Sequence, residues 1–157
     1  MKLINLYEEV LDGLFFNYET DEDGVEIIAL RNRKVVGKLC LVFVIDAWNE
    51  FEDAIESGEL PEEDYIKIFS NDRFAKIEHL NVIDGEKGKG IAKELVSKAI
   101  IYAKKDGEKV MYLNASPMGF TGLNINALVG FYKSFGFQPL IDSGHNVEMF
   151  LQIWKSL

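Results

Sequence analysis

The glycine-rich turn at residues 84–90 is the part of the sequence best suited to chemistry. It reads Asp-Gly-Glu-Lys-Gly-Lys-Gly and lies between a strand-like apolar run and a helix-like segment. Glycine lets a backbone approach a phosphate closely, and the free N–H groups at a helix start favour an anion. Lys87 and Lys89 add positive charge there. The pattern favours a phosphate-bearing ligand over the alternative, a solvated turn.

Two familiar phosphate-binding motifs do not fit this turn. A mononucleotide P-loop ends in Gly-Lys-Ser/Thr, whereas Gly90 is followed by Ile91 and Ala92. The dinucleotide fingerprint needs a third glycine three residues after Gly90, and Lys93 stands at that position. The sequence therefore excludes a P-loop and disfavours a nicotinamide cofactor.

Charge restricts the classes of partner. The 157 residues carry a formal net charge of −9, which disfavours nucleic acid because phosphates are bound by Lys and Arg. Residues 46–64 contain nine Asp or Glu and no Lys or Arg. This segment is either a solvated helix face or a surface that attracts a cationic substrate. No apolar run approaches the ~20 residues that cross a bilayer, so no membrane partner is expected.

Cysteine usage predicts a reducing, cytoplasmic location. Cys40 is the only cysteine, so no internal disulfide can form. It stands in an apolar stretch, which predicts a buried core thiol. Glu8 and Glu9 interrupt the first apolar run too early for a signal peptide. Two histidines and one cysteine are too few for a convincing zinc cluster, so no metal is expected.

The predicted elements define the fold that positions the glycine-rich turn. Hydrophobic spacing predicts helices over residues 3–11, 48–55, 61–69, 89–104 and 128–135, and strands over 14–18, 25–30, 35–45, 74–83, 110–114, 137–141 and 147–154. The first three strands form an antiparallel meander, and the strands flanking helix 89–104 can form a right-handed parallel crossover. The predicted class is α+β: one domain over residues 1–157, with a central, mixed, mostly antiparallel sheet and helices on both faces.

Residues 82–92 resemble the acetyl-CoA loop of the GNAT superfamily of N-acetyltransferases. The family pattern is Gln/Arg-x-x-Gly-x-Gly/Ala; Gly90 and Ala92 match it, and Lys87 stands at the Gln/Arg position. A second motif is similar to the late helix of the family and its Tyr-x-x-x-Gly-Phe ending: Leu128-x-x-Phe131-Tyr132-Lys133-x-Phe135-Gly136-Phe137. The resemblance is specific from about residue 77 to residue 137. Two motifs in the right order and on the right elements are stronger than either alone.

The resemblance implies how the chain holds acetyl-CoA as its cosubstrate. The implied pyrophosphate site is the backbone of Lys87, Gly88, Lys89, Gly90, Ile91 and Ala92. Val82 and Ile83 on the preceding strand would pair with the pantetheine arm. The Val82 N–H would polarise the thioester carbonyl, an oxyanion-type contact.

Acetyl transfer also needs an acid and a base, because an ammonium has no lone pair and the leaving thiolate takes up a proton. By resemblance, Tyr132 on the late helix is the proton donor; the alternative is a core aromatic, as expected for Phe131 and Phe135. Glu78 lies on the central strand, four residues before Val82, and is the candidate base. A partly buried carboxylate can act directly or through water, and the alternative is a solvated or structural carboxylate.

Two histidines complete the set of candidates. His79 follows Glu78, and a regular strand would place it on the opposite face. His145 lies in a Ser-Gly-His-Asn turn, where it either lines the mouth of the acceptor site or is solvated.

The implied activity is transfer of an acetyl group to a primary amine of a small molecule or protein, by direct attack. The acidic segment 46–64 points to a cationic acceptor, with Glu52 and Glu56 directed toward solvent or the acceptor cleft. The alternative is a CoA-binding or protein-interaction module that kept the fold without turnover, and a third reading is transfer of another acyl group. A homodimer is left open.

Overall fold

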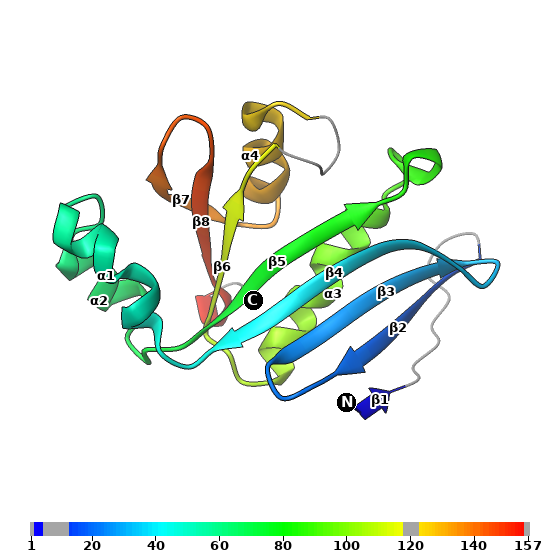
Figure 1. The fold of residues 1–157 in the computed structure, drawn as a ribbon, viewed down its shortest axis with the longest axis horizontal. Helices are drawn as coiled ribbons and strands as arrows, with labels where there is room; N and C mark the ends of the chain where they lie inside the picture. Colours follow the sequence, from blue (N-terminus) through cyan, green and yellow to red (C-terminus); the bar gives the residue numbers. More distant parts are fainter. Residues whose placement is uncertain (1, 5–12, 118–122, 156–157) are drawn as a thin grey trace.

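One eight-stranded sheet organises the chain, and the computed structural model describes residues 2–4, 13–117 and 123–155 of it (Figure 1). The strands are β1 Lys2–Ile4, β2 Leu14–Thr20, β3 Gly24–Arg31, β4 Lys34–Val44, β5 Phe74–Val82, β6 Val110–Ala115, β7 Gln138–Asp142 and β8 Val147–Gln152. The helices are α1 Ala47–Ser57, α2 Glu62–Ile68, α3 Ile91–Lys105 and α4 Ile125–Lys133, with short 3-10 turns η1 Asp84–Glu86 and η2 Ile153–Lys155.

The strand order is β1-β2-β3-β4-β5-β6-β8-β7. Every neighbouring pair is antiparallel except β5 and β6, which are parallel and joined through α3. The predicted α+β class, with its mostly antiparallel sheet and one parallel crossover, is confirmed.

Helices cover both faces of the sheet, as predicted. Along β6, Met111 and Leu113 join a core under α3 and α4, whereas Val110 and Tyr112 join a second core under α1 and α2. This alternation is the period-two pattern of a strand buried on both sides. In Figure 1, α3 runs behind β3, β4 and β5, and α1 and α2 lie together at one end of the sheet.

Close packing fixes the start of α3 against β4. Ile91 and Leu95 are fully buried at the first turns of this helix. A Cβ built at Gly37 of β4 would lie 3.0 Å from Ile91 Cγ2 and 3.2 Å from Leu95 Cδ1. The absence of a side chain at Gly37 therefore lets the N-terminus of α3 approach the sheet.

The predicted N-terminal helix is wrong at residues 3 and 4, which belong to β1, Lys2–Ile4, and pair with β2. The apolar spacing there suits a helix, but pairing with the free edge of β2 prevails over local spacing. Residues 5–11, the rest of that prediction, lie outside the described residues. The other predicted elements are present with bounds shifted by a few residues, and no described helix is long and apolar enough to cross a membrane.

Candidate active site

A β-bulge interrupts β5 at the position of the candidate base. Cys40 of β4 pairs with His79, and the next pair is Leu41 with Ile77, so Glu78 has no partner on β4. An extra residue in one strand bends that strand and disturbs the ladder locally. The bulge lies in the middle of β5, next to the parallel strand β6.

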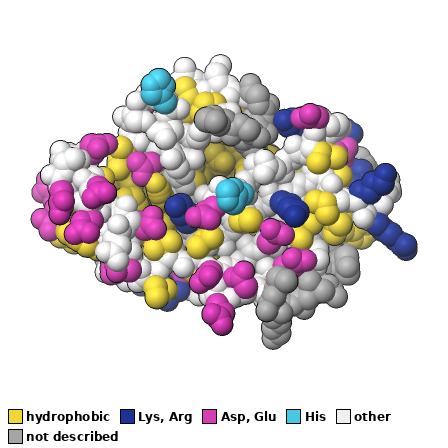
Figure 2. Space-filling model, viewed as in Figure 1, with side chains coloured by type: hydrophobic (Ala, Val, Ile, Leu, Met, Phe, Trp, Pro, Cys, Tyr) yellow, Lys and Arg dark blue, Asp and Glu magenta, His cyan; other side chains and the backbone are white. Residues whose placement is uncertain are grey.

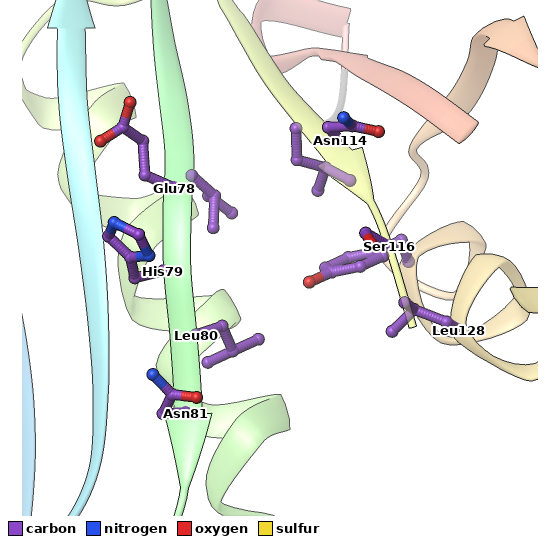
Figure 3. Close-up of a pocket in the computed structure, with 10 residues that line it drawn as sticks. Glu78, His79, Leu80, Asn81, Asn114, Ser116 and Leu128 are labelled. Carbon is purple, nitrogen blue, oxygen red and sulfur yellow. The ribbon is translucent and has the colours of Figure 1, made fainter. Parts of the chain in front are cut away.

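A pocket opens where β5 and β6 separate. The two strands pair only over Ala75–Ile77 and Met111–Leu113, although β5 runs on to Val82 and β6 to Ala115. The gap holds a pocket of about 180 Å³ (Figure 3). It is lined by Ile77, Glu78, His79, Leu80 and Asn81 of β5, Leu113 and Asn114 of β6, Ser116, and Leu128 and Tyr132 of α4.

The bulge places Glu78 and His79 on the same side of β5. Both are exposed, whereas Ile77 and Leu80 on either side of them are buried in the core under α3. Figure 3 shows Glu78 and His79 on the β4 side of the strand and Leu80 directed across the gap. The predicted placement of His79 on the face opposite Glu78 is therefore wrong, because the strand is not regular there.

Tyr132 reaches the pocket from α4. Tyr132 is 6% exposed, and its ring packs edge-on against the rings of Phe131 and Phe137, at 5.2 and 6.0 Å between ring centroids. No hydrogen bond to its hydroxyl is present among the described residues. Burial raises the pKa of Tyr132 well above its usual range, so the phenol stays protonated at neutral pH.

Glu78 lies within a chain of charges that begins on α1. Its side chain is 38% exposed, more open than the partly buried carboxylate expected from the sequence. Lys76 Nζ lies 3.7 Å from Glu78 Oε1 and 3.8 Å from Glu50 Oε2. The same ammonium sits 5.9 Å from the ring centroid of Tyr112, whose hydroxyl donates to Glu148.

Cys40 belongs to this charged surface. It is half-buried rather than part of either core, and its Sγ donates to Glu26 Oε2 at 3.6 Å. Burial first, and then the neighbouring Glu26 carboxylate, raise the pKa of the thiol to about 11. The predicted core thiol is therefore wrong, because Leu39 and Leu41 take the core side of β4 and Cys40 faces away from it.

The glycine-rich turn connects β5 to α3 through η1. Gly88 and Gly90 have φ of +81° and +84°, in the left-handed region that glycine adopts without strain. A Cβ at Gly88 would meet nothing within 4 Å, so the turn is open on that side. Gly90 caps α3 without a side chain, which leaves the N–H groups of the first turn without acceptors in the helix.

A second pocket, of about 310 Å³, lies against this turn. Val82, Gly88, Gly90, Ile91 and Ala92 line it together with Phe131 of α4. Phe131 is adjacent to Tyr132, so neighbouring residues of one helix line the pocket at the turn and the pocket between the strands.

Val82 and Ile83 present their backbones differently. The Ile83 N–H donates to Val36 at 3.0 Å, and the Ile83 carbonyl accepts from Glu86 at 3.0 Å. Successive N–H groups of a strand point to opposite edges, so the Val82 N–H faces away from β4, toward the gap. The expectation that both residues pair with a ligand is therefore corrected for Ile83, whose backbone groups already have partners in the chain.

The two lysines of the turn are paired with carboxylates. Lys87 Nζ lies 2.9 Å from Asp84 Oδ1, and Lys89 Nζ lies 2.8 Å from Glu86 Oε2. Glu86 also accepts from Arg31 Nε at 2.6 Å. Sequence reasoning missed this role of Glu86, because Arg31 is distant in the chain and no local pattern signals the pair.

The residues predicted to form the acceptor site do not all lie beside the pocket that contains Glu78 and Tyr132. Glu52 and Glu56 are exposed on α1 and line no pocket with Glu78, whereas Glu50 of the same helix contacts Lys76. His145 is exposed in the β7–β8 turn and does not line the pocket that contains Tyr132. Figure 2 shows Asp and Glu crowded over the end that carries α1 and α2, with Lys and Arg gathered at the opposite end.

The chain belongs to the acetyltransferase (GNAT) family, whose model matches residues 3–137. Acetyl transfer is the general activity that this membership supports. A comparison with curated proteins finds no significant match.

Solved structures share the fold at low sequence identity. Arylalkylamine N-acetyltransferase 2 from Aedes aegypti aligns with 82% of this chain and 73% of its own, at 19% identity and a TM-score of 0.57. The ribosomal-protein-S18-alanine N-acetyltransferase from Escherichia coli aligns over 85% and 72%, at 15% identity and 0.57. The PaiA N-acetyltransferase from Thermoplasma acidophilum, solved with coenzyme A, aligns over 83% and 61%, at 18% identity and 0.55. The chain thus spans less than two thirds of the length of this last protein.

Proposed function

We propose that the protein transfers an acetyl group from acetyl-CoA directly to a primary amine. The observation that carries this proposal is the gap between β5 and β6, which contains Tyr132 and leads along α4 to the glycine-rich turn. Membership of the acetyltransferase family supports the acyl group and its carrier. Nitrogen as the acceptor atom and the roles below are part of the proposal.

The glycine-rich turn suits the pyrophosphate of the cosubstrate. Gly88 and Gly90 leave the backbone accessible, and the N–H groups at the start of α3 are free of helical acceptors. The Val82 N–H, directed into the gap, polarises the thioester carbonyl there. These backbone groups hold the acetyl group beside Tyr132, so the reacting carbon lies between the two strands.

Tyr132 is the proposed proton donor. Its hydroxyl has no hydrogen-bond partner among the described residues, and a phenol carries its proton at neutral pH, so the proton is available for transfer. As the carbon–sulfur bond breaks, Tyr132 gives its proton to the departing thiolate. An acid of this kind stabilises the leaving group without being consumed, because solvent restores the proton.

Glu78 is the proposed base. The acceptor reaches the site as an ammonium, and its nitrogen can attack the thioester carbon only after it loses a proton. Glu78 belongs to the lining of the pocket and takes that proton directly or through one water. His79, on the same side of the bulge, is positioned beside this path rather than behind the strand.

The charges around the pocket suit a cationic acceptor. Glu50 and Glu78 both lie within 4 Å of the Lys76 ammonium, and Glu148 accepts from the hydroxyl of Tyr112, whose ring lies under that ammonium. The surplus of negative charge raises the local concentration of a polyamine, an aminoglycoside or a lysine-rich peptide. The acceptor contact on α1 is therefore assigned to Glu50 instead of Glu52 and Glu56.

An assay of thiol release tests the proposal against a binding module without turnover. Acetyl-CoA is titrated into the protein by calorimetry, and CoA release is then followed with a panel of cationic, neutral and anionic amines. We expect saturable binding of acetyl-CoA and thiol release that depends on the amine. Binding with no amine-dependent release identifies the binding module, and no binding at all rejects both functions.

A further inference from the structure

Glu86 is a buried carboxylate that the proposed chemistry does not use. Its side chain is 10% exposed and receives Arg31 Nε at 2.6 Å and Lys89 Nζ at 2.8 Å. These two cations lower the pKa of Glu86, the contact with Lys89 first. It lines the pocket at the glycine-rich turn, where an anionic ligand is proposed to bind.

The two contacts of Glu86 join the turn to the sheet. Arg31 is the last residue of β3, fixed by pairing with Leu14 and Lys34 on its two sides. Lys89 stands between the two left-handed glycines of the turn. The Glu86 side chain therefore ties the segment that carries the free N–H groups to a strand on the far side of β4.

The position of a carboxylate here is unexpected on electrostatic grounds. A negative charge beside a phosphate site repels the ligand, so a residue without a structural purpose there should be neutral or basic. Glu86 is offset by two cations, and it pairs with the Lys89 ammonium, a charge that would otherwise be available to an anion. Its benefit must come from holding the backbone of the turn.

We infer that Glu86 is a positioning residue for the cosubstrate: it holds the turn from Gly88 to Gly90 in the shape that receives the pyrophosphate. This inference rests on the proposed function. Glu86 acts through the backbone that it orders and through Lys89, and contacts no reacting atom.

The inference predicts an effect opposite in sign to that of charge alone. Changing Glu86→Gln removes the negative charge but also weakens both ion pairs. If Glu86 positions the turn, coenzyme A binds roughly tenfold more weakly, the scale of one charge-assisted hydrogen bond. If Glu86 only adds charge, the variant binds coenzyme A more tightly, most clearly at low salt.

The test is a calorimetric titration with coenzyme A, which needs no acceptor. The matched control is Glu108→Gln, because Glu108 is also buried and paired with an arginine, Arg73, but lies beyond the other end of α3 from the turn. We expect Glu86→Gln to raise the dissociation constant, the control to leave it unchanged, and saturating acetyl-CoA to restore the kcat of Glu86→Gln. An unchanged or lower dissociation constant for Glu86→Gln overturns the inference.

A second variant keeps the test decisive if Glu86→Gln folds poorly. Arg31→Met leaves Glu86 paired with Lys89 and should also weaken coenzyme A binding. In the double variant, the loss of binding free energy should be smaller than the sum of the two single losses, because both changes break one network. Unchanged coenzyme A affinity in Arg31→Met overturns the inference if Glu86→Gln does not fold, and additive effects of the two changes overturn it if Glu86→Gln folds. If the parent protein binds no coenzyme A, the proposed function fails as well; if it binds and both variants bind equally, the positioning role alone fails.

Discussion

Cys40 of β4 lies opposite His79 of β5, and the residue that precedes His79 has no partner on β4. This single unpaired residue changes which side chains of β5 face away from the core under α3. It turns the sequence Glu78-His79 into a pair of exposed neighbours at the edge of the pocket. Glu78, His79 and the Cys40 thiol therefore share one surface, while the core continues beneath them through Ile77 and Leu80.

Removing the hydroxyl of Tyr132 should affect turnover alone. Tyr132→Phe should lower kcat by roughly 10²-fold, the scale of an acid–base residue. Coenzyme A affinity should be unchanged. Because the hydroxyl has no partner among the described residues, the free energy of unfolding should change by less than about 0.5 kcal/mol. Steady-state kinetics measure kcat, and denaturant unfolding measures the free energy of unfolding. A loss of stability with unchanged turnover would show that Tyr132 is a core aromatic and not the proton donor.

A side chain at Gly90 should block the cosubstrate. Gly90 has φ +84°, so Gly90→Val strains the turn by about 1–3 kcal/mol and places methyl groups where a phosphate must approach the backbone. Gly107, with φ +86° and open space around it, provides the control. Gly107→Val should lose comparable stability and keep coenzyme A affinity. Equal affinity in both variants would show that the turn is not the phosphate site.

Carboxylates on α1 should differ in their effect on the acceptor. Glu50→Gln should raise the KM of a cationic amine by several-fold, because Glu50 is the acid of this helix that contacts Lys76. Glu56→Gln removes the same charge from an exposed position that lines no pocket with Glu78, and should change KM little. The effect of Glu50→Gln on KM should shrink as the salt concentration rises, because salt screens the electrostatic field of the carboxylate. A neutral or anionic amine as the best acceptor would contradict this assignment.

The Cys40 thiol should resist alkylation at neutral pH. Its pKa is raised to about 11 by burial and by Glu26, so the reactive thiolate is scarce below that pH. The rate of reaction with iodoacetamide should rise about tenfold per pH unit up to about pH 10 without levelling off. In Glu26→Gln the same curve should move to lower pH. A plateau near pH 9 in the parent protein would be inconsistent with the contact between Cys40 and Glu26.

Coenzyme A binding should lose its dependence on Glu86 in acid. The pKa of Glu86 is lowered by Lys89 and Arg31, so the carboxylate and its ion pairs persist below the ordinary pKa of a glutamate and disappear as pH falls through the lowered value. The ratio of the dissociation constants of Glu86→Gln and the parent should stay constant from neutral pH into mild acid and then approach one. Titrations across this range measure the ratio. A ratio that falls already near neutral pH would show that another group titrates.

Local patterns sufficed for the elements that carry the turn. The apolar strand, the glycines and the helical spacing of Ile91, Leu95 and Ala99 predicted the crossover from β5 through α3 to β6, and the structure contains it. Strand alternation would also have separated Cys40 from the core, but Cys40 stands in the continuous apolar run over residues 39–45, where alternation between apolar and polar residues cannot be seen. That residues 1–157 form one domain stays a prediction.

The features that sequence reasoning missed depend on contacts between distant residues. The strand at residues 2–4 depends on an edge 16 positions away, and the pairing of Glu86 depends on Arg31, separated from it by 55 positions. The bulge at Glu78 has no local signal, because one unpaired residue appears only when β5 is aligned with β4. The motif on the late helix was enough to name Tyr132 as a candidate. The contact of Glu50 with Lys76 could not be predicted, because it depends on where α1 lies relative to β5.

The most direct measurement follows the acetyl group itself. The protein is incubated with isotopically labelled acetyl-CoA and the amine that gives the fastest thiol release, and the products are analysed by mass spectrometry with fragmentation. The proposal predicts the label on the nitrogen of the amine, in equal amount to the CoA released, and roughly 10²-fold slower labelling with Tyr132→Phe. Label recovered only as free acetate, or on no product despite bound acetyl-CoA, would contradict acetyl transfer to an amine.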